Sequence, residues 1–157
     1  MNLIEFNKLC RDAAAVSGIA DIASLGLGDR VTVDEVVFES CFMEGQDAFI
    51  LLADLGHIAD EDRADVYEKL LTFQVARWRG MARLRFGLQP MRDMPVLAVT
   101  VTLGSQTDGA ALAALMRSMA AQVVQWRQTL LAGKVSPRLP GGVAGPHGGL
   151  AEPAIAR

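Results

Sequence analysis

Few residues in this chain of 157 could do acid–base, nucleophilic or metal chemistry. The sequence has two histidines, His57 and His147, and two cysteines, Cys10 and Cys41. No carboxylate stands at a characteristic spacing from His57, His147 lies in the Gly/Pro-rich tail, and the separation of the cysteines matches no metal-binding or redox motif. A Ser/His/Asp or Cys/His site assembles in space and so stays open, but nothing in the sequence marks one. We therefore predict no catalytic residue, and we expect both thiols to act as small buried hydrophobic groups.

Two glycine-rich stretches and one acidic cluster could indicate a cofactor or a metal. The glycines of residues 26–28 and 140–149 do not lie between a strand and the start of a helix, as a phosphate-binding loop requires. The carboxylates of Asp60, Glu61 and Asp62 are explained by capping of the helix that follows them. The sequence therefore predicts no cofactor and no metal.

The charge distribution argues against nucleic acid as a partner. Residues 1–65 carry 14 acids and 4 bases, whereas residues 66–132 carry 3 acids and 8 bases. A nucleic-acid site needs a basic footprint, and the cluster that offers one has no supporting motif: Arg77, Arg79, Arg83 and Arg85. We expect this cluster to be a solvated face, or a seam that meets an acidic surface.

The sequence also predicts a cytosolic protein without membrane insertion. Its apolar runs are much shorter than the roughly 18 residues that a membrane-spanning helix needs. The first residues, MNLIEFNKLCRD, lack the basic region of a signal peptide, and acids interrupt their apolar positions.

The first half of the chain has the pattern of a helix followed by three strands. Residues 3–17 form the helix, with Asn2 and Glu5 as a capping box and Gly18 after its end. A glycine-rich connector, 19–30, leads to strands at 31–33, 36–43 and 48–55, the last two joined by a turn at 44–47. Apolar residues lie on both faces of this hairpin, so we expect its second face to be covered at least in part.

The second half begins with a helix that starts near Asp60 or Asp62 and reaches Trp78. It has two apolar stripes, one of Ala64, Tyr67, Leu71, Val75 and Trp78, and one of Val66, Leu70 and Phe73 beside Arg77. One stripe is enough to pack a helix on a small domain. The second stripe either lies in the same core or contacts another subunit or protein.

Strands at 82–88 and 95–103 and a helix at 108–131 complete the domain. We predict one domain over residues 1–132 and a flexible Gly/Pro-rich tail over residues 133–157. The fold class is α+β, a twisted antiparallel sheet of about five strands with three helices in the order α-β-β-β-α-β-β-α, homodimeric.

This element order, together with three local patterns, resembles the Tir chaperone (CesT) family, the class I chaperones of bacterial type III secretion. The patterns are Leu70-Leu71-Thr72-Phe73-Gln74, the short strand ARLRFGL, and Trp126-Arg127 in the last helix. The resemblance covers about residues 2–132. The chain departs from the family at Gln74, where Asn is common, and at Arg79-Gly80-Met81, where the link is usually richer in glycine.

The resemblance implies a non-catalytic, cytoplasmic bacterial homodimer that works without ATP. Such a protein binds the N-terminal region of a secreted effector in extended form and keeps it soluble and competent for export. The implied dimer interface is Val66, Leu70, Phe73, Arg77, Leu84 and Phe86. The implied effector-binding residues are Ile4, Phe6, Val31, Val33, Val36 and Phe38.

Two alternatives remain at this point. The first is a regulator of the same fold that sequesters a transcription factor or a secretion component. The second is a small enzyme whose site carries no recognisable motif.

Overall fold

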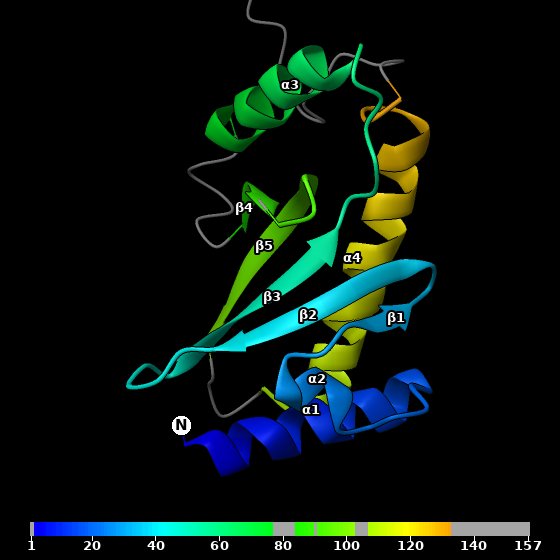
Figure 1. The fold of residues 1–157 in the computed structure, drawn as a ribbon. Helices are drawn as coiled ribbons and strands as arrows, with labels where there is room; N and C mark the ends of the chain where they lie inside the picture. Colours follow the sequence, from blue (N-terminus) through cyan, green and yellow to red (C-terminus); the bar gives the residue numbers. More distant parts are fainter. Residues whose placement is uncertain (1, 77–83, 90, 103–106, 133–157) are drawn as a thin grey trace, which may run out of the picture.

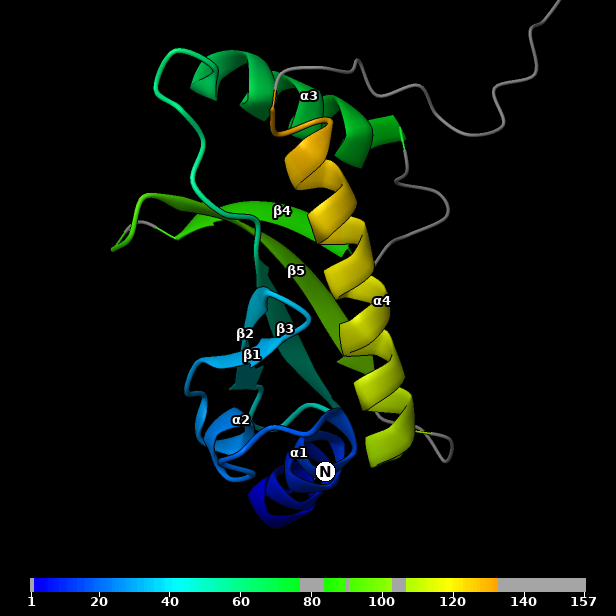
Figure 2. The ribbon, with the colours of Figure 1, turned by 90° about the vertical axis from the view of Figure 1, so that its right-hand side faces the viewer.

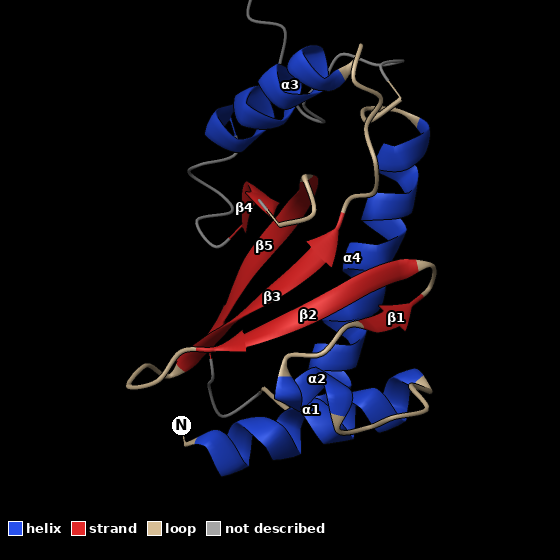
Figure 3. Ribbon diagram, in the orientation of Figure 1, coloured by secondary structure: helices blue, strands red, loops and turns tan. Residues whose placement is uncertain are grey.

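The computed structural model describes residues 2–76, 84–89, 91–102 and 107–132. In these ranges the chain forms four helices and five strands (Figures 1 and 3). In chain order they are α1 (Leu3–Ser17), α2 (Ser24–Leu27), β1 (Val31–Val33), β2 (Val36–Phe42), β3 (Ala48–Asp54), α3 (Arg63–Ala76), β4 (Leu84–Gln89), β5 (Met94–Thr102) and α4 (Gly109–Gln128). The predicted ends at 77–78, 82–83 and 103, and the predicted tail, lie outside the described residues.

The five strands form one antiparallel sheet in the order β1-β2-β3-β5-β4. The central pair is β3 and β5, whose register runs from Ala48 opposite Thr102 to Asp54 opposite Val96. β1 and β4 are therefore the two edge strands. This confirms the predicted α+β fold and its antiparallel sheet.

Among the described residues, helices cover one face of the sheet and not the other. In Figure 1, α4 crosses behind the strands and α1 lies at the lower end of the sheet; Figure 2 shows the same arrangement from the side. On this helix-covered face Phe38 and Leu51 are fully buried, and they pack with Phe6 of α1 and with Met116 and Val123 of α4. Because the strands alternate, residues such as Glu39 and Leu52 lie on the opposite face.

Both ends of α1 follow the predicted pattern. The Asn2 side chain accepts a hydrogen bond from the Glu5 amide, and the Glu5 carboxylate accepts one from the Asn2 amide. Gly18 ends the helix in the left-handed region, with φ of 73°. The guanidinium of Arg117 in α4 donates to the Val16 carbonyl at 2.7 Å, so α4 supplies a cation to the negative end of α1.

The helix α2 differs from the prediction, which assigned residues 19–30 to a connector. Leu25 is fully buried and anchors this short turn against α1. At Gly26 a Cβ atom would lie 2.8 Å from Oδ1 and 3.3 Å from Cα of Asn7, so glycine lets α2 approach α1 without displacing the Asn7 side chain. The glycine that indicated a flexible connector instead permits a packed contact.

Arg127, near the end of α4, binds three carbonyl groups in two separate parts of the backbone. Its guanidinium donates to the carbonyls of Leu55 at 3.0 Å, Asp54 at 2.9 Å and Glu35 at 3.0 Å. These carbonyls belong to the end of β3 and to the turn between β1 and β2. One side chain therefore fixes the sheet to its covering helix.

Candidate functional site

The residues that could do chemistry do not form a recognisable site in the described part of the chain. His57 is exposed, Cys41 is exposed and Cys10 is buried. Burial raises the pKa of the Cys10 thiol to about 12, which keeps it protonated and unreactive. Within the described ranges no group of three or more His, Cys, Asp and Glu side chains is arranged to hold a metal ion. No helix there is both long and apolar enough to cross a membrane.

The structure places five of the six predicted effector-binding side chains in the core. Phe6, Val31, Val33, Val36 and Phe38 are each at most 4% exposed, whereas Ile4 is 80% exposed. The buried side chains hold β1 and β2 against the helices. Ile4 on α1 stays accessible in this region. The outer backbone edge of β1 is also accessible, because in the part of the chain that the structure describes β1 pairs with β2 alone.

The face of the sheet opposite α4 has no helix over it among the described residues (Figures 1 and 2). We call it the helix-free face. Cross-strand pairing places five residues of β2, β3 and β5 on this face: Cys41, Ile50, Leu52, Ala98 and Thr100. Cys41 is exposed, and the other four are half-buried. A sheet face that meets only water is normally polar, so this apolar surface is suited to contact with another polypeptide.

A network of charges crosses one end of the helix-free face. Glu39 of β2 pairs with Arg30 at 3.3 Å and with Arg92 in the turn between β4 and β5. Arg30 also pairs with Asp54 at 3.0 Å, and Gln89 donates to Glu39 at 3.4 Å. The network borders the apolar patch and leaves its other end open.

The predicted dimer residues of α3 and β4 pack largely within the chain. Val66 is fully buried and Leu70 is 3% exposed. Phe73 and Phe86 contact each other and both contact Trp126 of α4, with ring centroids 5.5–6.0 Å apart. Leu84 is half-buried, and Arg77 lies outside the described residues. The stripe of Val66, Leu70 and Phe73 therefore attaches α3 to its own domain.

The other stripe of α3 faces outward. Leu71 is 57% exposed and Val75 is 72% exposed. The sequence pattern identified both stripes, but it could not indicate which one faces the core. We call Leu71 and Val75 the outer stripe.

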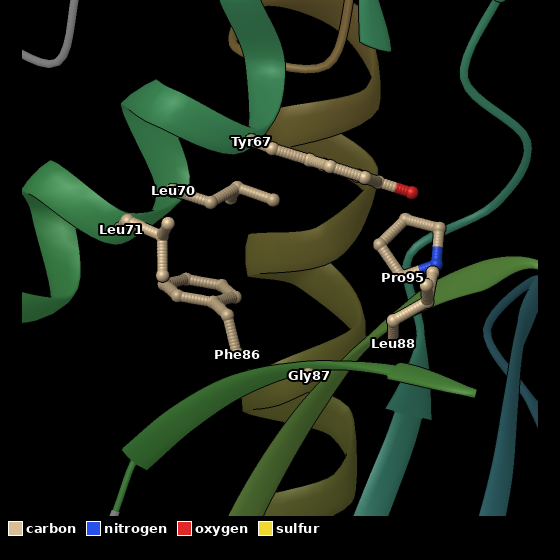
Figure 4. A pocket seen from close by; sticks show the side chains of 7 residues that line it. All are labelled: Tyr67, Leu70, Leu71, Phe86, Gly87, Leu88 and Pro95. Atoms are coloured by element: carbon tan, nitrogen blue, oxygen red, sulfur yellow. The ribbon is translucent and has the colours of Figure 1, made fainter. Parts of the chain in front are cut away.

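A pocket of about 170 Å³ opens beside the outer stripe, between α3 and β4. Its walls are almost entirely apolar (Figure 4): Tyr67, Leu70, Leu71, Phe86, Gly87, Leu88 and Pro95. The hydroxyl of Tyr67 is buried there without a hydrogen-bond partner among the described residues. We call this the α3–β4 pocket. It could not be predicted from the sequence, because its walls come from α3, β4 and the start of β5.

The outer edge of β4 is partly closed. Oε1 of Gln74 in α3 accepts a hydrogen bond from the Phe86 amide at 2.6 Å. This amide points away from β5, so it would otherwise be free to pair with an added strand. The two edges of the sheet thus differ: a side chain occupies the β4 edge at Phe86.

Comparison with known proteins gives a family and a similar structure. A search of curated proteins finds no match. A chain in the solved structure "Crystal Structure of the ExsC-ExsE Complex" has a TM-score of 0.62 and 16% sequence identity, covering 82% of this chain and 95% of that chain. At this identity the likeness shows the fold alone. The family described as "Tir chaperone protein (CesT) family" matches residues 30–127, which include all five strands, α3 and most of α4. The chain belongs to the Tir chaperone protein (CesT) family.

Proposed function

We propose that this protein is a non-catalytic chaperone of type III secretion in the bacterial cytoplasm. It binds the N-terminal region of a secreted effector in extended form and keeps that region soluble and competent for export. Membership in a chaperone family supports the class of function. The similar structure, determined as a complex of ExsC with ExsE, supports a partner-binding role for the fold.

The observation that carries the proposal is the helix-free face together with the free edge of β1. An extended segment can add to the edge of a sheet through its backbone and place alternate side chains on the adjoining surface. In this arrangement Thr32 contributes its outward backbone groups, because Val31 and Val33 on either side of it bond to β2. The buried side chains of Phe6, Val31, Val33, Val36 and Phe38 hold the strand pair in place from the core. Ile4 and the apolar residues of the helix-free face contact the effector side chains directly.

The proposed chaperone is a homodimer. The motive is the pair of apolar stripes on α3, of which the chain's own core uses one. A specific interface of ordinary size buries about 800 Å² on each partner. The outer stripe and the pocket beside it offer apolar surface for such a contact.

The test is co-expression with the N-terminal segment of a candidate effector encoded next to this gene, followed by co-purification. Leu3→Asp with Ile4→Asp, and separately Ile50→Asp, should each remove most of the captured effector, because a carboxylate must then be buried against an apolar segment. Met91→Asp is the matched control, since Met91 is 94% exposed and lies in the turn after β4. It should capture the effector like the wild type.

Circular dichroism checks that all three variants are folded before their capture of the effector is compared. Full capture by both folded test variants would refute the proposed surface. Recovery of a transcription factor or a secretion component, with no binding to secreted proteins, would favour the alternative of a regulator with this fold.

A further inference from the structure

We propose that Arg30 and Arg127 are positioning residues that hold the backbone of Thr32 ready as the docking point for an extended effector segment. Arg30 fixes the start of β1, and Arg127 fixes the turn that follows its end. This inference rests on the proposed function and names the residues on which binding at the β1 edge depends.

The docking point is a single residue because β1 is short. β1 has three residues, and Val31 and Val33 use their backbone groups to pair with β2. Thr32 lies between them and directs its amide and its carbonyl away from the sheet. An added strand therefore has one residue of β1 with which to form hydrogen bonds, and its affinity depends on how firmly that residue is held.

The turn between β1 and β2 needs support from outside itself. Its two central residues, Asp34 and Glu35, have positive φ angles of 45° and 66°. Glu35 stands where such two-residue turns favour glycine, and other residues keep these angles only where the surrounding structure holds them. The Arg127 guanidinium supplies this support from α4, because it donates to the Glu35 carbonyl while it also binds the carbonyls of Asp54 and Leu55.

Two ion pairs hold the other end of β1. Arg30 directly precedes the strand, and its guanidinium pairs with Glu39 of β2 at 3.3 Å and with Asp54 at the end of β3 at 3.0 Å. The side chains of Glu39 and Asp54 are 20% and 12% exposed, so salt screens these pairs less than it screens fully exposed ones. The residue before β1 is thus tied to two other strands of the sheet.

These contacts act on affinity by forming the edge in advance. A short edge strand with few hydrogen bonds opens easily, and the apparent dissociation constant rises as the fraction of molecules with a formed edge falls. A partner that meets a strand already in place loses less free energy to ordering. Neither arginine needs to touch the effector to have this effect.

The first test measures binding to the N-terminal segment of the candidate effector encoded next to this gene, by isothermal titration calorimetry. Arg30→Gln should raise the dissociation constant about tenfold, as expected if the edge is formed in about one molecule in ten. Arg92→Gln is the matched control, because Arg92 also pairs with Glu39 but comes from the turn between β4 and β5. It should bind like the wild type. Both arginine side chains are partly exposed, so both variants should stay folded.

A second test uses amide hydrogen exchange followed by NMR, which separates positioning from a general loss of stability. In the free Arg30→Gln chain the amides of Val31 and Val33 should exchange faster, whereas that of Leu51 in the central strand β3 should exchange as in the wild type. Arg127→Lys keeps the charge but loses the planar fork of donors, and it should speed exchange at Val33. In the wild type, binding of the effector segment should protect the Thr32 amide.

The outcomes distinguish this inference from the proposed function. A Thr32 amide that stays unprotected in the wild-type complex would overturn the docking point. Unchanged exchange in both arginine variants, or unchanged affinity in Arg30→Gln, would overturn the positioning role. Either result leaves the proposed chaperone standing, because the effector is still bound. A wild-type chain that binds no effector would refute the proposed function itself.

Discussion

The thiol of Cys10 and the hydroxyl of Ser40 form a small polar contact inside an otherwise apolar core. Cys10 is fully buried on α1, and Ser40 is 7% exposed on β2. The Ser40 hydroxyl donates to the Leu25 carbonyl of α2 and also lies within hydrogen-bonding reach of the thiol. The contact therefore joins α1, α2 and β2.

Stability should fall at high pH because of this thiol. Burial raises the pKa of Cys10 from an ordinary value of 9.0 to about 12. Below pH 9 the thiol is protonated in both folded and unfolded chains, so its contribution is fully present there. Between pH 9 and 12 only the unfolded chain loses the proton, which lowers the free energy of unfolding by up to about 1.4 kcal/mol per pH unit. Urea melts across this range should show a steeper loss for wild type than for Cys10→Ala; identical slopes would contradict the assignment.

The roles of two residues in the family patterns could not be derived from the sequence. Gln74 and Arg127 were recognisable only as members of those patterns. The structure shows that Gln74 binds an amide 12 residues later in the chain and that Arg127 binds carbonyls at least 72 residues earlier. Such hydrogen bonds cannot be recognised in a sequence pattern, because a backbone amide or carbonyl can belong to any type of residue.

The elements themselves were largely predictable, because hydrophobic periodicity and capping residues are local signals. The predicted helix at 3–17 and strand at 31–33 coincide with α1 and β1, and the other strands agree within a residue or two over the described ranges. The long helices begin or end up to three residues away from the prediction. The assignment of faces was not predictable, because α3 has apolar residues around much of its circumference. The stripe that is inside is the one whose Phe73 packs against Trp126, a residue far away in the sequence.

The contact between α1 and α4 should be sensitive to a single methyl group. At Gly109 a Cβ atom would lie 2.5 Å from Cβ of Asp12 and 2.8 Å from the amide nitrogen of Ala13. Gly109→Ala gains at most about 1 kcal/mol of helix propensity, but the overpacking costs about 1–3 kcal/mol. Thermal and urea unfolding should show net destabilisation. Ser118→Ala, on the exposed side of α4, is the control and should be neutral or slightly stabilising; a more stable Gly109→Ala would show that the helices adjust freely.

At the scale of the whole molecule, we assign different roles to the two edges and the two faces of the sheet. One face is covered by α1 and α4 and holds the core. The other face and the β1 edge are assigned here to an extended effector, and the α3 side to a second copy. Both proposed partners can therefore bind at once, because their surfaces lie at opposite edges of the sheet.

The tail should be dispensable for folding and for association. From Val135 onward the sequence has no periodic apolar positions with which to offset the entropy of ordering. Deletion of residues 135–157 should leave the melting temperature within about 4 °C, the shift that about 1 kcal/mol produces in a chain of this size. Calorimetry and light scattering on the truncated chain test this. A large drop in melting temperature, or a change in oligomeric state, would mean that the tail packs against the domain.

The hydrogen bond from the Phe86 amide to Gln74 affects how molecules of this protein can associate edge to edge. A sheet with two open edges can pair β1 of one molecule with β4 of the next, and such head-to-tail contacts grow into fibres without limit. A protein that keeps the β1 edge accessible for a client is exposed to this form of polymerisation. Gln74 already accepts the hydrogen bond of the Phe86 amide at the β4 edge, so this amide is not available to an incoming β1 strand and head-to-tail pairing is hindered at that point.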